Sequence, residues 1–477
     1  MKRFLTAGQW GLVVLLVLGT AVAVAPRASA GAGYSAVIVA DKPLGYWRLG
    51  ESDPSQPAKD ASGNGNDGTY NLGVTVGQPG AISRDPDTAV KFDGSTGYVD
   101  IPSSAGGTFD LGNGFTLEAW VLNTGNGTGQ AGRIFSNREP GFGLGIKYTG
   151  VVDSVRFTTF GVKDYDSTLT VIPEDGNYHH LVLVFDSSST ANFYVDGNLT
   201  DSIPGPGPAR SSNSHLYIGT NPASPEYFGG NIDEAAIYKY ELTAAQIKTH
   251  FQAGAPYPAI VKADLPLGYW RLGESDPSQP AKDASGNGND GTYNGGVTVG
   301  QPGAIKGDAN TAAQFDGSTG FVDIPSSAGG TFDLLNSFTL EAWVINAGTS
   351  TGGVAGRIFS NRQPGFGFGV KHAGTDTLRF TTFGVQDYDS VAVVPEDGNF
   401  HHIVVVFDST NAANFYLDGQ LTDSIPGGNP AQGSAHDLWI GSNPVSPEWF
   451  GGTIGEAAIY TYELTAAQIL AHFQAAQ

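Results

Sequence analysis

The sequence FTLEAWV, at residues 115–121, recurs letter for letter at residues 338–344. Apolar residues occupy every second position of this segment, which is typical of a β-strand with one face against a core. The identity extends outward, because residues 43–71 recur as residues 266–294 and residues 242–247 match residues 464–469. A repeat of this length predicts a duplicated domain and not a solenoid of short units.

Each half has the pattern of an all-β domain. Short runs rich in Val, Ile, Phe, Tyr and Thr are interrupted by clusters of Gly, Asn, Asp and Pro. Residues 181–185 form a continuous apolar strand, as the centre of a sandwich requires. A short helix is expected from the cap Thr243 to Phe251, with Gln246 at the capping-box position. The pattern predicts two tandem antiparallel β-sandwich (jelly-roll) domains, each with a short C-terminal helix.

The boundaries of these units follow from composition. Residues 1–30 have the features of a secretory signal peptide: a basic start, an apolar run over 11–25 and the small-residue site Ala28-Ser29-Ala30. An uncleaved N-terminal anchor is the alternative, but the apolar run is short for a membrane span. The first domain is predicted at 31–252, a stiff linker at 253–258 and the second domain at 259–477. We therefore expect a secreted protein with no membrane insertion after signal cleavage.

The charge and cysteine content limit the partners. The chain has 24 basic and 46 acidic residues and no cysteine. Nucleic acid and anionic lipid both require basic patches, so neither is expected as a partner. A secreted domain without disulfides needs another staple or a large core, and more than two hundred residues per half can supply the core. The excess of carboxylates also leaves some of them free to hold a divalent cation.

A series of short motifs resembles a known family. In the first half these motifs are YWRLGE at 46–51, DASGNGNDG at 60–68, VKFDG at 90–94, FTLEAW at 115–120, GNYHHL at 176–181, FYVDG at 193–197, LYIG at 216–219 and IDEAAIY at 232–238. Their order and spacing are similar to those of the laminin G-like domains of the concanavalin A-like lectin/glucanase superfamily. The resemblance implies a two-sheet jelly roll, often with bound calcium, that binds carbohydrate or protein outside the cell.

One loop is a candidate calcium site. Asp60, Ser62 and Asn64 alternate and are followed by Gly65, which resembles the start of an EF-hand loop. Asn71 at the twelfth position and the absence of flanking predicted helices exclude a true EF-hand. Asn66 adds another oxygen to the loop, and we expect structural Ca²⁺ here. The alternative is an ordinary Asn-Gly turn held by its own side-chain hydrogen bonds.

The resemblance implies further calcium ligands at Asp93 and near Asp233. The corresponding candidates in the second half are Asp283, Ser285, Asn287, Asn289, Asp316 and Glu456. Gly455 replaces Asp233 there, so the second calcium site is predicted to be weaker.

No catalytic arrangement is expected. Retaining glycosidases need two carboxylates about 5 Å apart, whereas Glu118 stands among apolar residues and Asp233 and Glu234 should point to opposite faces of one strand. We therefore predict that the chain is not an enzyme. His179-His180, like residues 401–402, could suggest zinc, but the favoured interpretation is one buried histidine beside one that faces outward.

Two loops combine aromatic rings with acids, the mixture that suits sugar recognition. The candidate ligand-binding residues are Asp164, Tyr165, Asp166 and Tyr227, recurring as Asp387, Tyr388, Asp389 and Trp449. The alternative is that these rings pack onto the sandwich edge. Trp47, Trp120, Trp270 and Trp343 are predicted to be core. The leading hypothesis is non-catalytic recognition of an extracellular glycan. The rivals are an adhesive module that binds a surface protein and, less favoured, a degenerate glycosidase.

Overall fold

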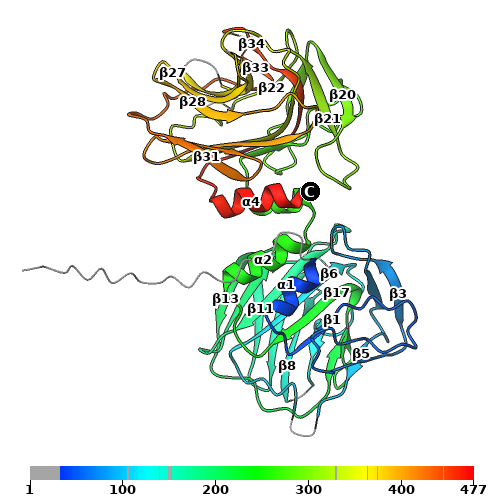
Figure 1. The fold of residues 1–477 in the computed structure, drawn as a ribbon. Coiled ribbons are helices and arrows are strands. Elements are labelled where there is room, and N and C mark those ends of the chain that lie inside the picture. The colour runs from blue at the N-terminus through cyan, green and yellow to red at the C-terminus, as the bar shows by residue number, and fades with distance from the viewer. Residues whose placement is uncertain are drawn as a thin grey trace, which may run out of the picture.

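A computed structural model describes residues 33–477 except 105–106, 139, 149, 151–152, 328–329, 362–363, 373 and 444. These residues form two β domains arranged one above the other (Figure 1). The predicted signal peptide at 1–30 lies outside the described residues. Within the part of the chain that is described, no helix has both the length and the apolar character needed to cross a membrane.

The first domain is a sandwich of two sheets, antiparallel apart from one short parallel bridge between β16 and β7. Its helix-side sheet runs, in spatial order, β13 (Asn198–Pro204), β12 (Thr190–Val195), β11 (His179–Phe185), β6 (Phe115–Asn123), β17 (Gly229–Tyr238), β4 (Thr88–Asp93) and β3 (Val74–Pro79), with β1 (Gly45–Trp47) on β17. Its outer sheet runs β10 (Lys163–Val171), β9 (Ser154–Phe160), β8 (Gly141–Lys147), β7 (Gly132–Ser136), β14 (Leu216–Ile218), β5 (Val99–Ile101) and β2 (Thr69–Tyr70), with β15 (Thr220–Asn221) and β16 (Glu226–Tyr227) beside β7.

The second domain repeats this topology. Its helix-side sheet runs β20 (Val297–Pro302), β21 (Thr311–Asp316), β35 (Gly451–Tyr460), β23 (Phe338–Asn346), β29 (His401–Phe407), β30 (Ala413–Leu417) and β31 (Gln420–Ile425), with β18 (Gly268–Trp270) on β35. Its outer sheet runs β19 (Thr292–Asn294), β22 (Phe321–Ile324), β32 (Leu438–Ile440), β25 (Ala355–Ser360), β26 (Gly365–Lys371), β27 (Thr377–Phe383) and β28 (Gln386–Val393), with β24 (Thr351–Gly352), β33 (Ser442–Asn443) and β34 (Glu448–Trp449) at its side. The predicted pair of sandwich domains is confirmed.

The segment quoted first is a central strand in each domain. Phe115, Leu117, Ala119 and Val121 of β6 face the apolar core between the two sheets. The alternate face carries Trp120, which is buried against the helices of the domain and not between the sheets. This two-sided burial follows from the strand period of two, because helices cover the face that water would otherwise reach.

Four helices cover the helix-side sheets: α1 (Tyr34–Ala40), α2 (Ala244–Gly254), α3 (Tyr257–Ala263) and α4 (Ala466–Ala475). The predicted capping box of Thr243 and Gln246 is present at α2. Residues 253–258 differ from the predicted linker, because α2 continues to Gly254 and α3 begins at Tyr257. Pro258 is tolerated there because the first helical turn needs no N–H donor.

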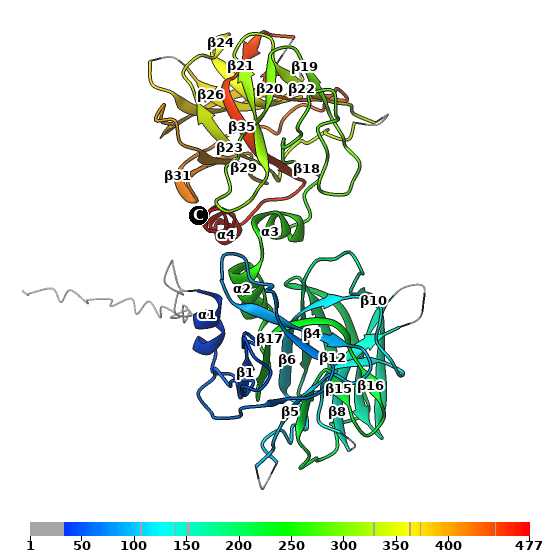
Figure 2. The ribbon, with the colours of Figure 1, turned by 90° about the vertical axis from the view of Figure 1, so that its right-hand side faces the viewer.

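The two domains contact each other through their helices (Figures 1 and 2). One apolar cluster contains residues of both domains, including Phe251 of α2 and Ile260 of α3. Among the residues that the structure describes, two polar contacts join the domains: Lys248 Nζ lies 3.1 Å from Asp264 Oδ1, and Asn198 Nδ2 donates to the Ala263 carbonyl at 3.1 Å. The helices α2, α3 and α4 therefore form most of the junction, and the β10 edge of the first domain's outer sheet also reaches it through Leu169 and Val171.

Candidate functional site

The predicted calcium loop is held by its own hydrogen bonds. The Asp60 carboxylate accepts from the backbone N–H groups of Tyr46, Ser62 and Asn66 at 3.1, 2.9 and 2.8 Å. The Asn64 side chain donates to the Pro43 carbonyl at 3.0 Å. These bonds tie the loop to the segment between α1 and β1. This is the arrangement expected of an Asn-Gly turn held by its own side-chain hydrogen bonds, which was the alternative to a calcium site.

The other predicted ligands do not converge on Asp60. Asp93 closes a separate turn, in which its Oδ1 accepts from the N–H groups of Thr96 and Gly97 at 2.7 and 2.9 Å. Asp93 lies opposite Gly229 of β17. Asp233 is four residues further along the same strand, so at 3.3 Å per residue it lies about 13 Å from Gly229. The prediction that these residues share one ion is therefore wrong.

The second domain has the same arrangement. Asp283 accepts from the N–H groups of Tyr269, Ser285 and Asn289. Asp316 closes its own turn, and Glu456 is bound by Arg271 at 2.9 Å. Across the described residues, no group of three or more acidic, histidine or cysteine side chains is arranged to hold a metal. The full predicted set does not fit calcium, and binding by the Asp60 loop alone stays a prediction.

Asp233 and Glu234 lie in the interior and not in a loop. The pairing of β17 with β6 shifts register between Asp233 and Ala236, and Glu234 has a φ of 51°. This bulge breaks the strand alternation on which the prediction of opposite faces depended. Arg48 Nε donates to Glu234 at 3.0 Å, and the Ala81 N–H donates to Asp233 at 2.7 Å. Burial raises the pKa of both carboxyl groups.

The predicted division of the His179-His180 pair is confirmed. His180 is fully buried, and its Nε2 lies 2.7 Å from Glu118 Oε1. His250 of α2 approaches the same carboxylate at 3.0 Å and reaches Asp41 Oδ2 at 2.9 Å with its other nitrogen. Although burial alone would lower it, the carboxylates of Glu118 and Asp41 raise the pKa of His250 to about 9. The same contacts in the second domain join Glu341, His402, His472 and Asp264.

The predicted ligand-binding segments turn out to be strands. Asp164, Tyr165 and Asp166 lie in β10, and Asp387, Tyr388 and Asp389 lie in β28. Tyr165 and Tyr388 are wholly buried in the sandwich cores. Their prediction as exposed sugar-stacking rings is wrong, because alternation along the strand turns each ring inward and its flanking acids outward.

One of the outward acids, Asp387, lines a polar groove on the outer sheet. In the second domain the groove has a volume of about 390 Å³, and its lining includes Arg357, Arg379, Thr381, Asp387 and Glu448. Thr381 Oγ1 donates to Asp387 Oδ1 at 2.8 Å, and Arg379 Nη1 donates to Asp387 Oδ2 at 3.3 Å. The Asp387 side chain remains 51% exposed. It therefore presents a positioned carboxylate to solvent.

The buried arginine Arg357 forms the base of this groove. Its guanidinium donates to Glu448 at 2.8 Å and to Thr381 Oγ1 at 3.1 Å, and lies 5.2 Å from the centre of the Phe383 ring. Hydrogen bonds from Arg379 and Lys371 lower the pKa of Asp389 to about 2, although partial burial alone would raise it. Asp389 is thus fixed in its charged form, which holds Arg379 beside Asp387.

The first domain repeats the groove contacts. Thr158 Oγ1 donates to Asp164 Oδ1 at 2.8 Å, and Arg156 Nη1 lies 3.5 Å from Asp164 Oδ2. Arg133 Nε donates to Glu226 at 2.8 Å. The Asp164 side chain is 45% exposed. Sequence reasoning identified the two acids but missed the arginines and threonines, although the alternating Arg156-Phe157-Thr158 pattern places both polar side chains on the outward face.

Tyr227 and Trp449 occupy the short strands β16 and β34 beside the groove. Each is half-buried. The Trp449 ring lies 6.1 Å from the Phe321 ring at a tilt of 54°. Glu448, the residue before it, lines the groove of the second domain, whereas Trp449 does not.

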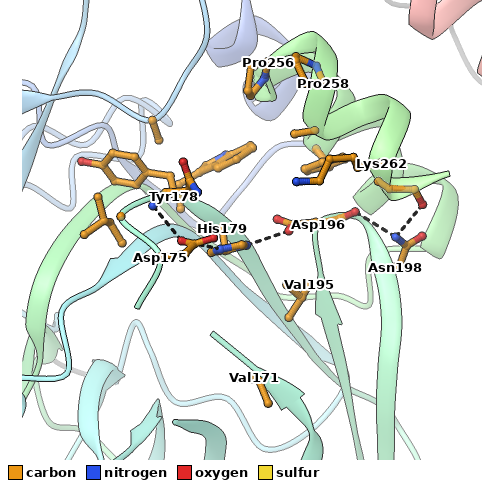
Figure 3. Close-up of a pocket in the computed structure, with 18 of the residues that line it drawn as sticks. Val171, Asp175, Tyr178, His179, Val195, Asp196, Asn198, Pro256, Pro258 and Lys262 are labelled. Atoms are coloured by element: carbon orange, nitrogen blue, oxygen red, sulfur yellow. Dashed lines mark hydrogen bonds and ion pairs between the residues drawn. The ribbon is translucent and has the colours of Figure 1, made fainter. Parts of the chain in front are cut away.

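A larger cleft of about 1000 Å³ lies where the first domain meets α3 (Figure 3). Its polar groups are largely paired with one another: His179 bridges Asp196 and Asp175 at 2.9 and 3.4 Å, and the Tyr178 hydroxyl donates to Pro79 at 2.7 Å. At its rim Leu169 is 69% exposed. The cleft therefore offers mainly apolar surface, and sequence analysis did not identify it because two domains build it.

The two-layer antiparallel sheets and their repeated topology define a tandem jelly-roll protein of the lectin type. The family model of the concanavalin A-like lectin/glucanases superfamily matches residues 93–248 and 316–470. The chain belongs to this superfamily and consists of tandem laminin G-like domains, as the motifs predicted.

Several solved structures are similar to the chain. Domain 4 of AbnA, an extracellular GH43 arabinanase from Geobacillus stearothermophilus in complex with arabinotriose, is 21% identical with a TM-score of 0.34, over 44% of this chain and 98% of that one. The binding domain of Paraclostridial Mosquitocidal Protein 1 is 11% identical with a TM-score of 0.34, over 80% and 76% of the two chains. Domains LG4-5 of the mouse laminin alpha1 chain are 11% identical with a TM-score of 0.25, over 82% and 94%. No curated protein matches the chain.

Proposed function

We propose that this chain is a secreted, non-catalytic carbohydrate-binding protein that uses the outer-sheet groove of each domain. One observation carries the proposal: an exposed carboxylate, Asp387 or Asp164, is fixed beside an arginine and a threonine on the outer sheet, and Asp387 also lines a polar groove. Sugar hydroxyl groups both donate and accept, so a carboxylate acceptor next to guanidinium donors matches them on one face.

The size of the groove supports a glycan over a protein partner. A stable protein interface buries about 800 Å² on each partner. The groove is a narrow hollow of about 390 Å³ with polar walls, suited to a small polar group and not to an extended protein surface. The adhesive alternative would require a larger apolar patch on the same face, because the centre of a protein interface is depleted of charge.

The electrostatics of the groove support binding without bond cleavage. A general acid for glycoside hydrolysis must hold a proton near neutral pH. Asp389 instead accepts hydrogen bonds from Arg379, which lower its pKa to about 2. Glu448 accepts a hydrogen bond from Arg357. These charge partners argue against an acid–base pair at this position. The predicted signal peptide at 1–30 supports export, which N-terminal sequencing of protein from the culture medium would test.

The test is binding to a panel of immobilised polysaccharides, namely arabinan, xylan, galactan and laminarin. We expect the intact chain to be retained by at least one of them. The double variant Asp164→Ala/Asp387→Ala should lose retention, because both groove carboxylates are gone. Asp53→Ala/Asp276→Ala removes two exposed acids at equivalent positions outside the grooves and serves as the matched control. Equal retention of both double variants would overturn the groove assignment.

A further inference from the structure

A pair of aromatic rings lies beside the polar groove of the second domain. The Trp449 ring of β34 and the Phe321 ring of β22 are 6.1 Å apart. Trp449 pairs with Arg357, which forms the base of the groove, and directly follows the groove residue Glu448. Because Val322 faces the core, the alternation along β22 turns Phe321 to the outward face. The ring pair therefore continues the surface that holds the groove.

This part of the outer sheet is open to solvent. Phe321 and Trp449 are both only half-buried. β22 and β34 lie at the end of the second domain that is far from α4 and the first domain (Figure 1). Phe450, which follows Trp449, is instead wholly buried in the core. The two rings thus offer an apolar face to a ligand, beside a groove with polar walls.

Carboxylates border the two rings. Asp323 lies two residues after Phe321 on the same face of β22 and is opposite Trp439 of β32. Asp437, just before β32, accepts from the Ser326 N–H at 2.7 Å, which fixes its carboxylate beside that strand. A sugar ring has an apolar C–H face and hydroxyl groups at its edges. Aromatic rings with carboxylates beside them match both features.

The first domain also has aromatic rings at this place, although the residues differ. Tyr98 and Tyr217 stand at the positions of Phe321 and Trp439. The two tyrosine rings lie 6.1 Å apart, and the His215 ring stacks on Tyr217 at 6.2 Å with an angle of 25° between the planes. Each ring has therefore changed its type between the domains while the position has stayed aromatic.

The groove and the ring pair together are too long for a single sugar. Thr381 of the groove lies on β27, and Phe321 lies four strands away on β22. Neighbouring strands are about 4.8 Å apart, so these positions are on the order of 20 Å apart across the sheet. One sugar ring covers only a small part of this length. A ligand that uses both features must be a chain of several sugar units lying across the strands.

We infer that the outer sheet of the second domain binds an extended stretch of a polysaccharide, with one sugar in the groove and another stacked on Trp449 and Phe321. This inference rests on the proposed carbohydrate binding of the groove and adds a second subsite and the class of ligand. Asp387 and its arginine partners position one sugar, and the rings add affinity only for a chain long enough to reach them. Binding therefore becomes tighter as the chain becomes longer.

The experiment is calorimetric titration with the disaccharide and the hexasaccharide of arabinan, xylan, galactan and laminarin. Every protein carries Asp164→Ala, so that the second domain is measured by itself. We expect at least one hexasaccharide to bind about tenfold more tightly than its disaccharide, a gain of the size that aromatic contact supplies. Trp449→Ala and Phe321→Ala should each bind the two lengths with equal affinity, because the ring pair is lost.

Two variants serve as controls. Trp449→Phe keeps an aromatic face and should keep the preference for the hexasaccharide. Phe400→Ala removes a partly buried ring of the second domain that packs against the helix-side cluster, away from the outer sheet. It should also keep the preference. Urea unfolding confirms that each variant is folded, and the two ring variants are independent of each other if one of them is not.

The outcomes separate this inference from the proposed function. If the folded ring variants still prefer the hexasaccharide, the ring subsite is overturned and binding by the groove stands. Equal affinity for both lengths before the rings are changed overturns it as well, and so does loss of disaccharide binding in a folded ring variant. Undiminished disaccharide binding after Asp387→Ala overturns the groove itself. Binding of none of these oligosaccharides overturns both proposals.

Discussion

Raising the pH should weaken both domains through the histidines that dock their C-terminal helices. His250 packs against Glu118 and Asp41, and His180, Tyr34 and Tyr238 also interact with the Glu118 carboxylate. Its pKa is about 9 in the folded chain, against 6.5 for an ordinary histidine. A histidine with a raised pKa stabilises the fold fully below about pH 6.5, and this stabilisation is lost as the pH rises through 9. The shift corresponds to about 3 kcal/mol.

The assay is urea unfolding at pH 6 and pH 9 for the intact chain and for His250→Gln. We expect the free energy of unfolding of the first domain to fall by about 3 kcal/mol more in the intact chain than in the variant between these pH values. The second domain serves as an internal control, because His472, whose pKa is also about 9, is unchanged in that variant. Equal pH dependence of the first domain with and without His250 would refute the reasoning.

Further predictions concern other buried or hydrogen-bonded acids. Asp60→Ala removes the acceptor of three backbone N–H groups, so we expect it to cost the first domain about 3 kcal/mol in urea unfolding. The loss measured with chelator reports these hydrogen bonds alone, and a larger loss with calcium would assign the loop to the metal as well. No loss with chelator would contradict the structural role of the hydrogen bonds. Burial raises the pKa of Asp233. Keeping this side chain buried therefore costs folding free energy once the pH rises above about 4, where the carboxyl group of the unfolded chain is ionised. Asp233→Asn should therefore gain more stability at pH 8 than at pH 4 in thermal unfolding, and a larger gain at pH 4 would contradict this.

Much of the fold could be predicted from local pattern. The alternation in residues 115–121 and the repetition of the chain identify central strands and two equal domains. The capping box at Thr243 correctly marks the start of a helix. These features depend on neighbours in sequence, which the pattern records directly.

The site was less predictable because it depends on contacts between distant segments. The mixture of aromatic rings and acids around Tyr165 predicts a binding loop, yet the Asp-Tyr-Asp alternation fits a strand that turns the ring inward. Residue types alone gave no indication that Asp93 of β4 lies opposite Gly229 of β17, four residues from Asp233. Glu118 could not be paired with His250 either, because the two residues are 132 positions apart in the chain.

Calorimetric titration of the full chain with a fragment of the polysaccharide that retains it tests most directly whether the two outward hollows are the places where sugar binds. We predict two equivalent fragments per molecule for the natural sequence, one for Asp387→Ala and none for Asp164→Ala/Asp387→Ala. Undiminished uptake by the doubly substituted chain would contradict the account.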